Sequence, residues 1–121
     1  MILYYAHAMP IYRTLAEKRE LRQIRSKFPR ARVVNPAKCQ NHPEKRRDKI
    51  GFCLRLVENS DAVVFSKYQG KITAGVGKEA NHALRIGLPV YELEGSLFKR
   101  RRGRVRHMSL KATLQLYYGW Y

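Results

Sequence analysis

Acidic residues are scarce in this sequence: nine Asp and Glu stand against 25 Lys and Arg in 121 residues. The formal net charge of +16 is extreme for a chain of this length and favours a polyanionic partner, either a nucleic acid or a phosphorylated small molecule. The alternative is a basic surface that only faces solvent, as in proteins adapted to heat. A carboxylate kept in so basic a chain is a candidate for chemistry.

Cysteine is scarce as well, and long apolar runs are missing. Cys39 and Cys53 are the two cysteines, too few for a disulfide framework. No signal peptide and no apolar run of about 18 residues is visible, so we expect a cytoplasmic protein that does not enter a membrane. The length and the 45% content of hydrophobic residues predict a single domain over residues 1–121 with one core.

Cysteine and histidine are the usual ligands of zinc, and the candidates here are Cys39, His42, Cys53 and His82. The first two have the spacing of a zinc pair. The other two fall on expected helices, and no second pair has a matching spacing. We therefore expect no metal and no cofactor.

Short apolar runs alternate with segments of helical periodicity along most of the chain. Strands are expected in residues 1–9, 31–35, 62–66 and 87–93, and helices in residues 10–28, 50–57 and 80–86. Parallel strands need crossover connections of helix length. The pattern thus predicts an α/β fold, doubly wound, with a mostly parallel sheet of four to five strands and helices on both faces.

Two of the remaining segments are expected to be irregular, and the last one is expected to be helical. Residues 38–49 are polar and interrupted by proline, which indicates a loop. Six basic residues crowd residues 99–106 without an apolar period, which predicts a basic loop or arm. Leu110, Leu114 and Tyr117 then resume a helical spacing before an aromatic C-terminus.

A glycine-containing turn, TAGVGKE at residues 73–79, follows the third expected strand. In a doubly wound sheet, ligands bind where the strands end, and the N–H groups at the start of a helix favour phosphate. Gly75 and Gly77 would let the backbone approach a phosphate, and Thr73 would add its hydroxyl. The alternative is a turn that only shapes the fold, because short Gly-x-Gly turns are common.

Residues 56–93, LVENSDAVVFSKYQGKITAGVGKEANHALRIGLPVYEL, resemble the nucleoside 2-deoxyribosyltransferase-like family. The TAGVGKE turn is close to that of the deoxynucleoside 5'-monophosphate N-glycosidase branch, and the opening ILYYAHAMP fits the family more loosely. The resemblance implies that Glu79 attacks the anomeric carbon of the sugar, that Asp61 helps to hold the sugar in the same cleft, and that Thr73 meets the 5'-phosphate. It also implies a homodimer.

The chemistry explains why a carboxylate is needed, since cleavage of an N-glycosidic bond develops oxocarbenium character that a carboxylate stabilises or captures. For Glu79 the alternative is an ordinary glutamate in the first turn of a helix, where the dipole favours it. For Asp61 the alternative is a turn residue that satisfies backbone groups.

Tyr5 and His7, at the end of the first expected strand, are predicted to line the substrate site. His7 takes the place of a glycine that is usual in the family. It is either an acid for the leaving base or a packed residue at a strand end.

Two functions of different classes follow. The first is an N-glycosidase or deoxyribosyltransferase acting on a nucleotide or a related phosphorylated N-glycoside, with the choice between hydrolase and transferase left open. The second is a nucleic-acid-binding protein that grips a strand with residues 99–106 and with Tyr117, Tyr118, Trp120 and Tyr121.

Overall fold

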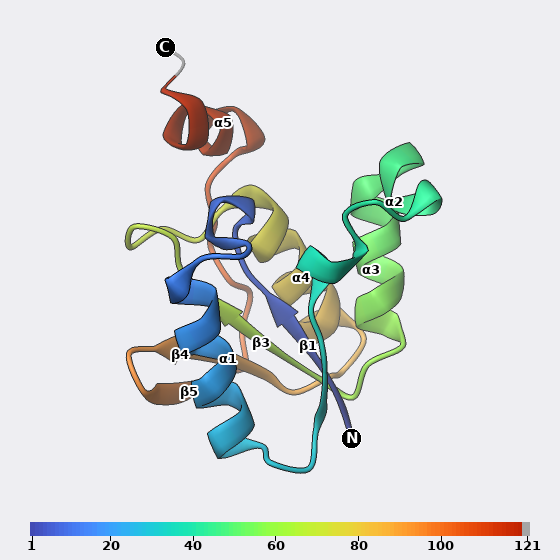
Figure 1. Ribbon diagram of the computed structural model, residues 1–121, viewed down its shortest axis with the longest axis vertical. Coiled ribbons are helices and arrows are strands. Elements are labelled where there is room, and N and C mark those ends of the chain that lie inside the picture. Colours follow the sequence, from blue (N-terminus) through green and yellow to red (C-terminus); the bar gives the residue numbers. More distant parts are fainter. Residues whose placement is uncertain (120–121) are drawn as a thin grey trace.

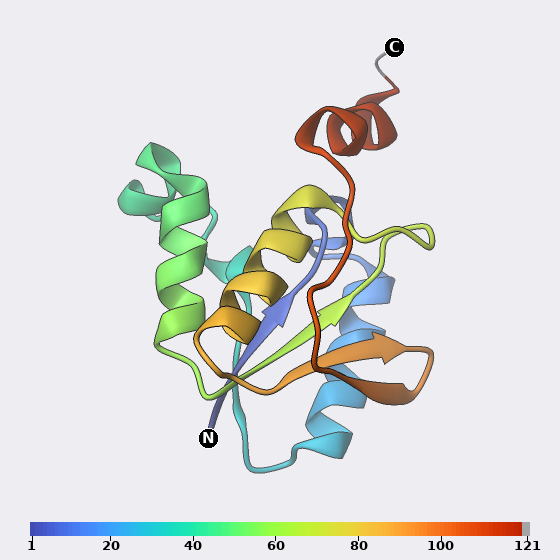
Figure 2. The same ribbon diagram turned by 180° about the vertical axis from the view of Figure 1, so that it is seen from behind.

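The computed structural model describes residues 1–119, which form one five-stranded sheet with helices on both of its faces (Figures 1 and 2). The strand order is β2-β1-β3-β4-β5; the first four strands are parallel, and β5 pairs with β4 in the antiparallel sense. The predicted fold class is thereby confirmed. The elements are, in order, β1 (Ile2–Ala6), η1 (Met9–Ile11), α1 (Leu15–Lys27), β2 (Arg32–Val34), η2 (Pro36–Cys39), α2 (Pro43–Arg47), α3 (Lys49–Glu58), β3 (Ala62–Ser66), α4 (Ala74–Arg85), β4 (Val90–Glu94), β5 (Leu97–Arg101) and α5 (Leu110–Tyr118).

The central strands are apolar because both of their faces are covered. Side chains of a strand alternate between the two faces of the sheet, so β1 and β3 contribute to two cores. Tyr4 and Phe65 pack beneath α3 and α4, whereas Tyr5 and Val64 pack against Leu21 of α1. The two neighbouring tyrosines of β1 therefore lie on opposite faces of the sheet.

The first long helix begins later than the sequence predicted. Pro10 lies in the short η1, and Arg13 has a φ of 63°, a left-handed conformation that interrupts the helical path. Helix α1 then begins at Leu15, where the Thr14 hydroxyl accepts a hydrogen bond of 3.3 Å from the Glu17 N–H. The expected start at Pro10 is wrong, because local backbone geometry broke a continuous apolar period.

Two segments expected to be loops contain regular structure. Residues 38–49 hold the end of η2 and all of α2, and His42 caps α2 through a bond of 3.2 Å from the Glu44 N–H to its Nδ1. The first half of the basic segment forms β5, which pairs with β4 around a hairpin turn at Gly95. The predicted basic loop over residues 99–106 is therefore wrong up to Arg101. An edge strand with an exposed face has no need of the apolar alternation that would have revealed it.

Residues 102–109 connect β5 to α5 and run across the side of the sheet that carries α4 (Figure 2). We call them the return segment. Val105, in its middle, is completely buried and belongs to the core under α3 and α4. Helix α5 projects beyond the carboxyl ends of the parallel strands and ends at Gly119, whose φ of 68° is typical of a helix C-cap. Trp120 and Tyr121 of the expected aromatic C-terminus lie outside the described residues.

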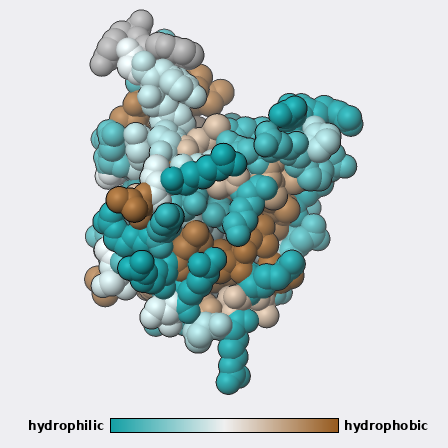
Figure 3. Space-filling model, viewed as in Figure 1, coloured by the Kyte–Doolittle hydropathy of each residue, from teal (hydrophilic) through white to brown (hydrophobic). Residues whose placement is uncertain are grey.

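Hydrophilic side chains cover much of the face seen in Figure 3, around an apolar area in its middle. In residues 1–119, no helix combines the length and the apolar character needed to cross a membrane.

Candidate active site

A cavity of about 340 Å³ lies at the carboxyl ends of β1 and β3. From β1 the chain proceeds outward to β2 on one side, and from β3 to β4 on the other, so these two strands mark the point where the strand order reverses. Crevices at such points are the usual ligand sites of doubly wound sheets. The walls come from the segment after β1, from α3, from the start of α4 and from α5; they include His7, Met9, Tyr12, Lys49, Cys53, Thr73, Gly75, Val76, Lys78, Glu79, Leu110, Thr113 and Tyr117.

Glu79 is the carboxylate of this cavity. It lies in the second turn of α4, half-buried, and its Oε2 accepts a hydrogen bond of 3.0 Å from the Tyr4 hydroxyl. Burial raises the pKa of Glu79 to about 7, against the opposing effects of the Tyr4 hydrogen bond and of the Lys45 and Lys49 charges. Glu79 thus exchanges its proton near neutral pH, the property expected of a residue that donates, accepts or attacks.

Helix α4 begins directly after Thr73, so the predicted turn over residues 73–79 is wrong and Gly75 and Gly77 are helical. The Gly77 N–H donates to the Thr73 carbonyl at 2.9 Å, so it is not available to a phosphate. A β-carbon at Gly77 would lie 2.2 Å from the ring of His107, which shows that this glycine allows the return segment to pass close to α4. Gly75 has open space around it and lines the cavity.

The start of α4 still presents N–H groups to the cavity. The first turn of a helix has no intrahelical acceptors for its N–H groups. The Ala74 N–H donates to Thr113 Oγ1 of α5 at 2.9 Å, while Gly75 and Val76 line the cavity. Thr73 is buried beside them and lines the same cavity. Thr73 and Gly75 are therefore together at the cavity, as the sequence predicted.

Asp61 lies at the opposite edge of the sheet. Its Oδ2 accepts a hydrogen bond of 2.6 Å from the N–H of Ile2, the first residue of β1, and its own N–H donates to the Ile2 carbonyl at 2.7 Å. Asp61 thus joins the amino ends of β1 and β3 and does not line the cavity of Glu79. The expected cleft with two carboxylates is wrong. The position of Asp61 in the sequence already argued against a place in the cleft, because Asp61 precedes its strand whereas ligands bind where parallel strands end.

Tyr5 is also away from the cavity, and Tyr4 stands in its place. The Tyr5 hydroxyl hydrogen-bonds with Glu20 of α1, on the other face of the sheet. Tyr4, which was not predicted to be a site residue, reaches Glu79. The alternation of side chains along β1 separates the two residues, and the apolar run gave no indication of which face would carry the site.

His7 lines the cavity, but both of its ring nitrogens have protein partners. Nε2 lies 2.8 Å from Glu17 Oε2, Nδ1 lies 3.1 Å from the Tyr5 carbonyl, and the ring stacks on Tyr5. Burial lowers the pKa of His7 despite the neighbouring Glu17. This arrangement suits a fixed wall better than an acid for a leaving base, since neither nitrogen is directed at the cavity without a partner.

Three side chains near Glu79 were not anticipated. Cys53 is buried, and burial together with the Glu79 charge raises the pKa of its thiol. Lys49, one helical turn before Cys53, contacts the sulfur of Met9, and partial burial and the Lys45 charge lower its pKa. Tyr12 is the third of these side chains and lines the same cavity as Glu79. Residues four apart on α3 share a face, but the sequence did not reveal that this face meets Glu79.

The two histidines considered for zinc have other partners. His42 packs on Phe52 with 4.8 Å between ring centres, and His82 Nε2 lies 2.8 Å from Glu58 Oε1. Within residues 1–119, no three His, Cys, Asp or Glu side chains gather closely enough to hold a metal ion.

Comparisons with protein-family models, with curated protein sequences and with solved structures find no match to this chain.

Proposed function

We propose that this chain is an enzyme that cleaves the N-glycosidic bond of a nucleotide or a related phosphorylated N-glycoside, with Glu79 as the reacting carboxylate. One observation carries the proposal: a half-buried carboxylate, held by the Tyr4 hydroxyl, lines a cavity at the carboxyl ends of β1 and β3. The resemblance of residues 56–93 to nucleoside 2-deoxyribosyltransferase-like proteins supports the choice of reaction.

In the proposed reaction, a Glu79 oxygen bonds to the anomeric carbon while the carbon–nitrogen bond breaks. The bonding electron pair leaves with the base, which takes up a proton from solvent. Water then displaces Glu79 in a hydrolase, or the nitrogen of a second base does so in a transferase. The attacking form of Glu79 is ionised, and the Tyr4 hydrogen bond and the Lys45 and Lys49 charges favour that form.

The phosphate of the substrate would bind at the start of α4. Backbone N–H groups at a helix start attract phosphate, and those of Gly75 and Val76 lie in the first turn. Thr73 adds a hydroxyl, and Lys49 and Lys78 add positive charge at the rim. This set supports a phosphorylated substrate over an uncharged nucleoside.

The cleft shared by Glu79 and Asp61, which was the structural condition for the reaction as the resemblance implied it, is absent. That condition fails, and the present proposal is a revised one that rests on Glu79 alone. With Asp61 at the other edge, the sugar would contact the side chains that surround Glu79 here, namely Tyr12, Cys53 and Thr113.

Release of free base tests the proposal. Deoxynucleoside monophosphates are incubated with the wild-type protein and with Glu79→Gln, and the products are separated by chromatography. Base release by the wild type that is abolished in Glu79→Gln is the expected result. Glu94→Gln, an exposed change on β4, is the matched control and should keep the wild-type rate. Absence of base release by the wild type, or equal rates for Glu79→Gln and wild type, would overturn the proposal.

The nucleic-acid-binding alternative in its original form loses part of its support. Lys99 lies 3.3 Å from Glu94, and Arg101 contacts Glu92, so two cations of the basic segment are paired within the sheet. Among the described residues, positive charge without an ion pair gathers instead on the return segment and on α4.

A further inference from the structure

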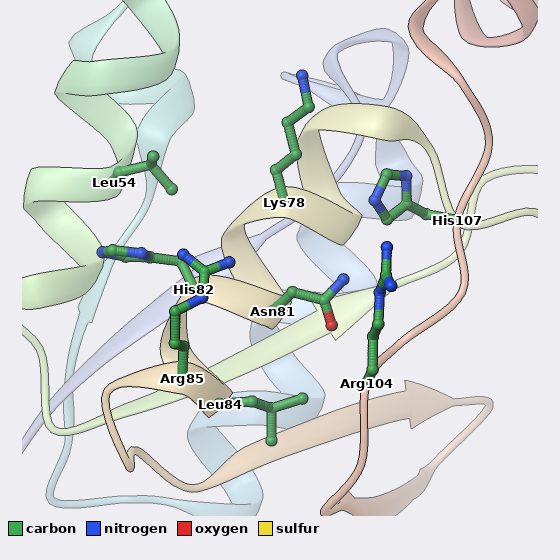
Figure 4. A pocket seen from close by; sticks show the side chains of 8 residues that line it. All are labelled: Leu54, Lys78, Asn81, His82, Leu84, Arg85, Arg104 and His107. Atoms are coloured by element: carbon green, nitrogen blue, oxygen red, sulfur yellow. The ribbon is translucent and has the colours of Figure 1, made fainter.

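Basic side chains from two distant parts of the chain border one hollow on the α4 side of the sheet. Lys78 and Arg85 come from α4, and Arg104 and His107 come from the return segment; the hollow between them has a volume of about 500 Å³. Figure 4 shows these side chains around Asn81, with Leu54 of α3 and Leu84 on the remaining sides. The hollow is next to the cavity of Glu79, and Leu54 and Lys78 line both.

The return segment is fixed to α4, so the backbone that carries its arginines is held in place. The Asn81 side chain donates to the Val105 carbonyl at 2.9 Å and accepts from the Val105 N–H at 2.7 Å. Farther along, the Met108 N–H donates to the Ile72 carbonyl at 2.9 Å. Val105 is completely buried, whereas Arg104 and Arg106 on either side of it are exposed. Ordering these arginines upon binding therefore has a reduced entropic cost, because their backbone is already fixed.

The hollow is the first of a connected row. A second hollow shares Arg104 and His107 with it, and a third shares Arg106 and His107 with the second and reaches Lys71. We call the cations along this row, Lys71, Lys78, Arg85, Arg104 and Arg106, the basic track.

The positive charge of the basic track is not neutralised by the protein. Among residues 1–119, none of its five cations forms an ion pair, whereas Lys67 nearby lies 3.2 Å from Glu92 and His82 is held by Glu58. Repulsion between these cations is a cost in the unbound protein that an anionic ligand removes.

We propose that the basic track binds the backbone of single-stranded nucleic acid. A row of hollows with several cations fits a chain of phosphates, whereas one mononucleotide would occupy only one of them. The apolar side chains of Leu54 and Leu84 and the rings of His82 and His107 supply surfaces against which unpaired bases can pack. This site goes beyond the proposed cleavage reaction and does not depend on it.

Fluorescence anisotropy with a labelled thymidine oligonucleotide of about 12 nucleotides, titrated over a range of salt concentrations, tests the site. The test variant is the double change Arg85→Gln and Arg104→Gln. The matched control is Arg22→Gln and Arg25→Gln, which removes the same charge from exposed positions of α1 on the other face of the sheet. Glu79→Gln is measured alongside.

We expect wild-type binding to weaken steeply with salt. Each phosphate contact contributes about 0.7 to the logarithmic salt slope of a single strand, which amounts to roughly fivefold in affinity at 0.1 M salt. The test variant should therefore bind about 25-fold more weakly with a slope reduced by about 1.4, and the control variant at most about twofold more weakly. Glu79→Gln should bind like the wild type, which separates this site from the proposed catalytic one.

Equal losses in the test and control variants would overturn the proposal, because they would show attraction by net charge alone. Absence of wild-type binding at low salt would overturn it as well. A duplex of the same sequence that competes better than the single strand would overturn the assignment to single strands.

Discussion

The Tyr4 hydroxyl donates a hydrogen bond of 3.0 Å to Glu79 Oε2, joining the third residue of β1 to the middle of α4. Tyr4 is completely buried, so the orientation of this hydroxyl is set by the core and not by solvent. Two opposing influences thus act on one carboxyl group: burial favours its protonated form, and the Tyr4 hydrogen bond favours its ionised form.

Tyr4→Phe should raise the pKa of Glu79 further, because it removes a hydrogen bond that stabilises the carboxylate. A hydrogen bond to a charged group contributes roughly 1.5 to 3 kcal/mol, so the expected rise in pKa is about one to two units. Titration of a carbon-13 label in the glutamate side chains by NMR measures it. Tyr5→Phe, on the opposite face of the sheet, is the control and should leave Glu79 unchanged. No change in Tyr4→Phe would show that the hydrogen bond does not control this carboxyl.

Glu79→Gln should stabilise the fold at alkaline pH but not at acidic pH. The pKa of Glu79 is about 7 in the folded protein and 4.5 in the unfolded chain. Between these two pH values the folded state binds more protons than the unfolded state, so the free energy of unfolding decreases as the pH rises from 4.5 to 7. The destabilisation caused by ionising Glu79 in the folded protein is absent below about pH 4.5 and reaches about 3 kcal/mol above pH 8. It is absent at every pH in the glutamine variant, which cannot ionise. Urea unfolding at both pH extremes measures it. The same free-energy difference between the two proteins at both pH values would contradict the prediction.

The two glycines of α4 should respond in opposite ways to alanine. Gly77→Ala forces a β-carbon to within 2.2 Å of His107, and such overpacking costs roughly 1 to 3 kcal/mol. Gly75→Ala meets open space in the same helix and should stabilise it by up to about 1 kcal/mol. Thermal unfolding of both variants against the wild type is the measurement. Similar melting temperatures for the two variants would show that the return segment yields to the extra methyl group.

Thr73→Val should weaken binding of the phosphate group of a nucleotide without weakening binding of its sugar and base. The change removes a hydroxyl at similar volume, so a monophosphate should bind more weakly by roughly 1.5 to 3 kcal/mol, while the matching nucleoside should be almost unaffected. Isothermal titration calorimetry with the two ligands is the measurement. Glu79→Gln is the complement, since it should bind the monophosphate but not turn it over. Equal losses for both ligands in Thr73→Val would mean that the start of α4 only shapes the fold.

A homodimer is expected from the resemblance, and α5 is the natural element of its interface. Leu110 on this helix is 59% exposed, and aromatic residues follow it. Light scattering at micromolar concentration should give twice the mass of one chain, and Leu110→Lys should shift it toward the monomer. Leu15→Lys on α1, where the side chain is 78% exposed, is the control and should not. A wild-type monomer would contradict the expectation.

Local sequence signals determined the sheet and most of its helices. The strand over residues 62–66 was predicted with its observed bounds, because a fully buried parallel strand leaves an uninterrupted apolar run bounded by polar residues. Glu79 and Thr73 were singled out from a short motif and do lie at one cavity. Strand β5 was not predicted because it lies at the edge of the sheet, and its sequence of two apolar residues followed by three cations carries no alternating signal.

The partners of Glu79 were decided only by tertiary structure. Tyr4, Lys49 and Cys53 reach it from β1 and α3, and nothing in their local sequence states which face of a buried strand or which side of a helix will meet α4. The basic track was hidden for the same reason: Lys78 and Arg104 become neighbours only because Val105 enters the core and Gly77 lets the return segment approach α4. Periodicity reports which residues are buried, since burial depends on local spacing. Which buried surfaces meet depends on the packing of the whole chain.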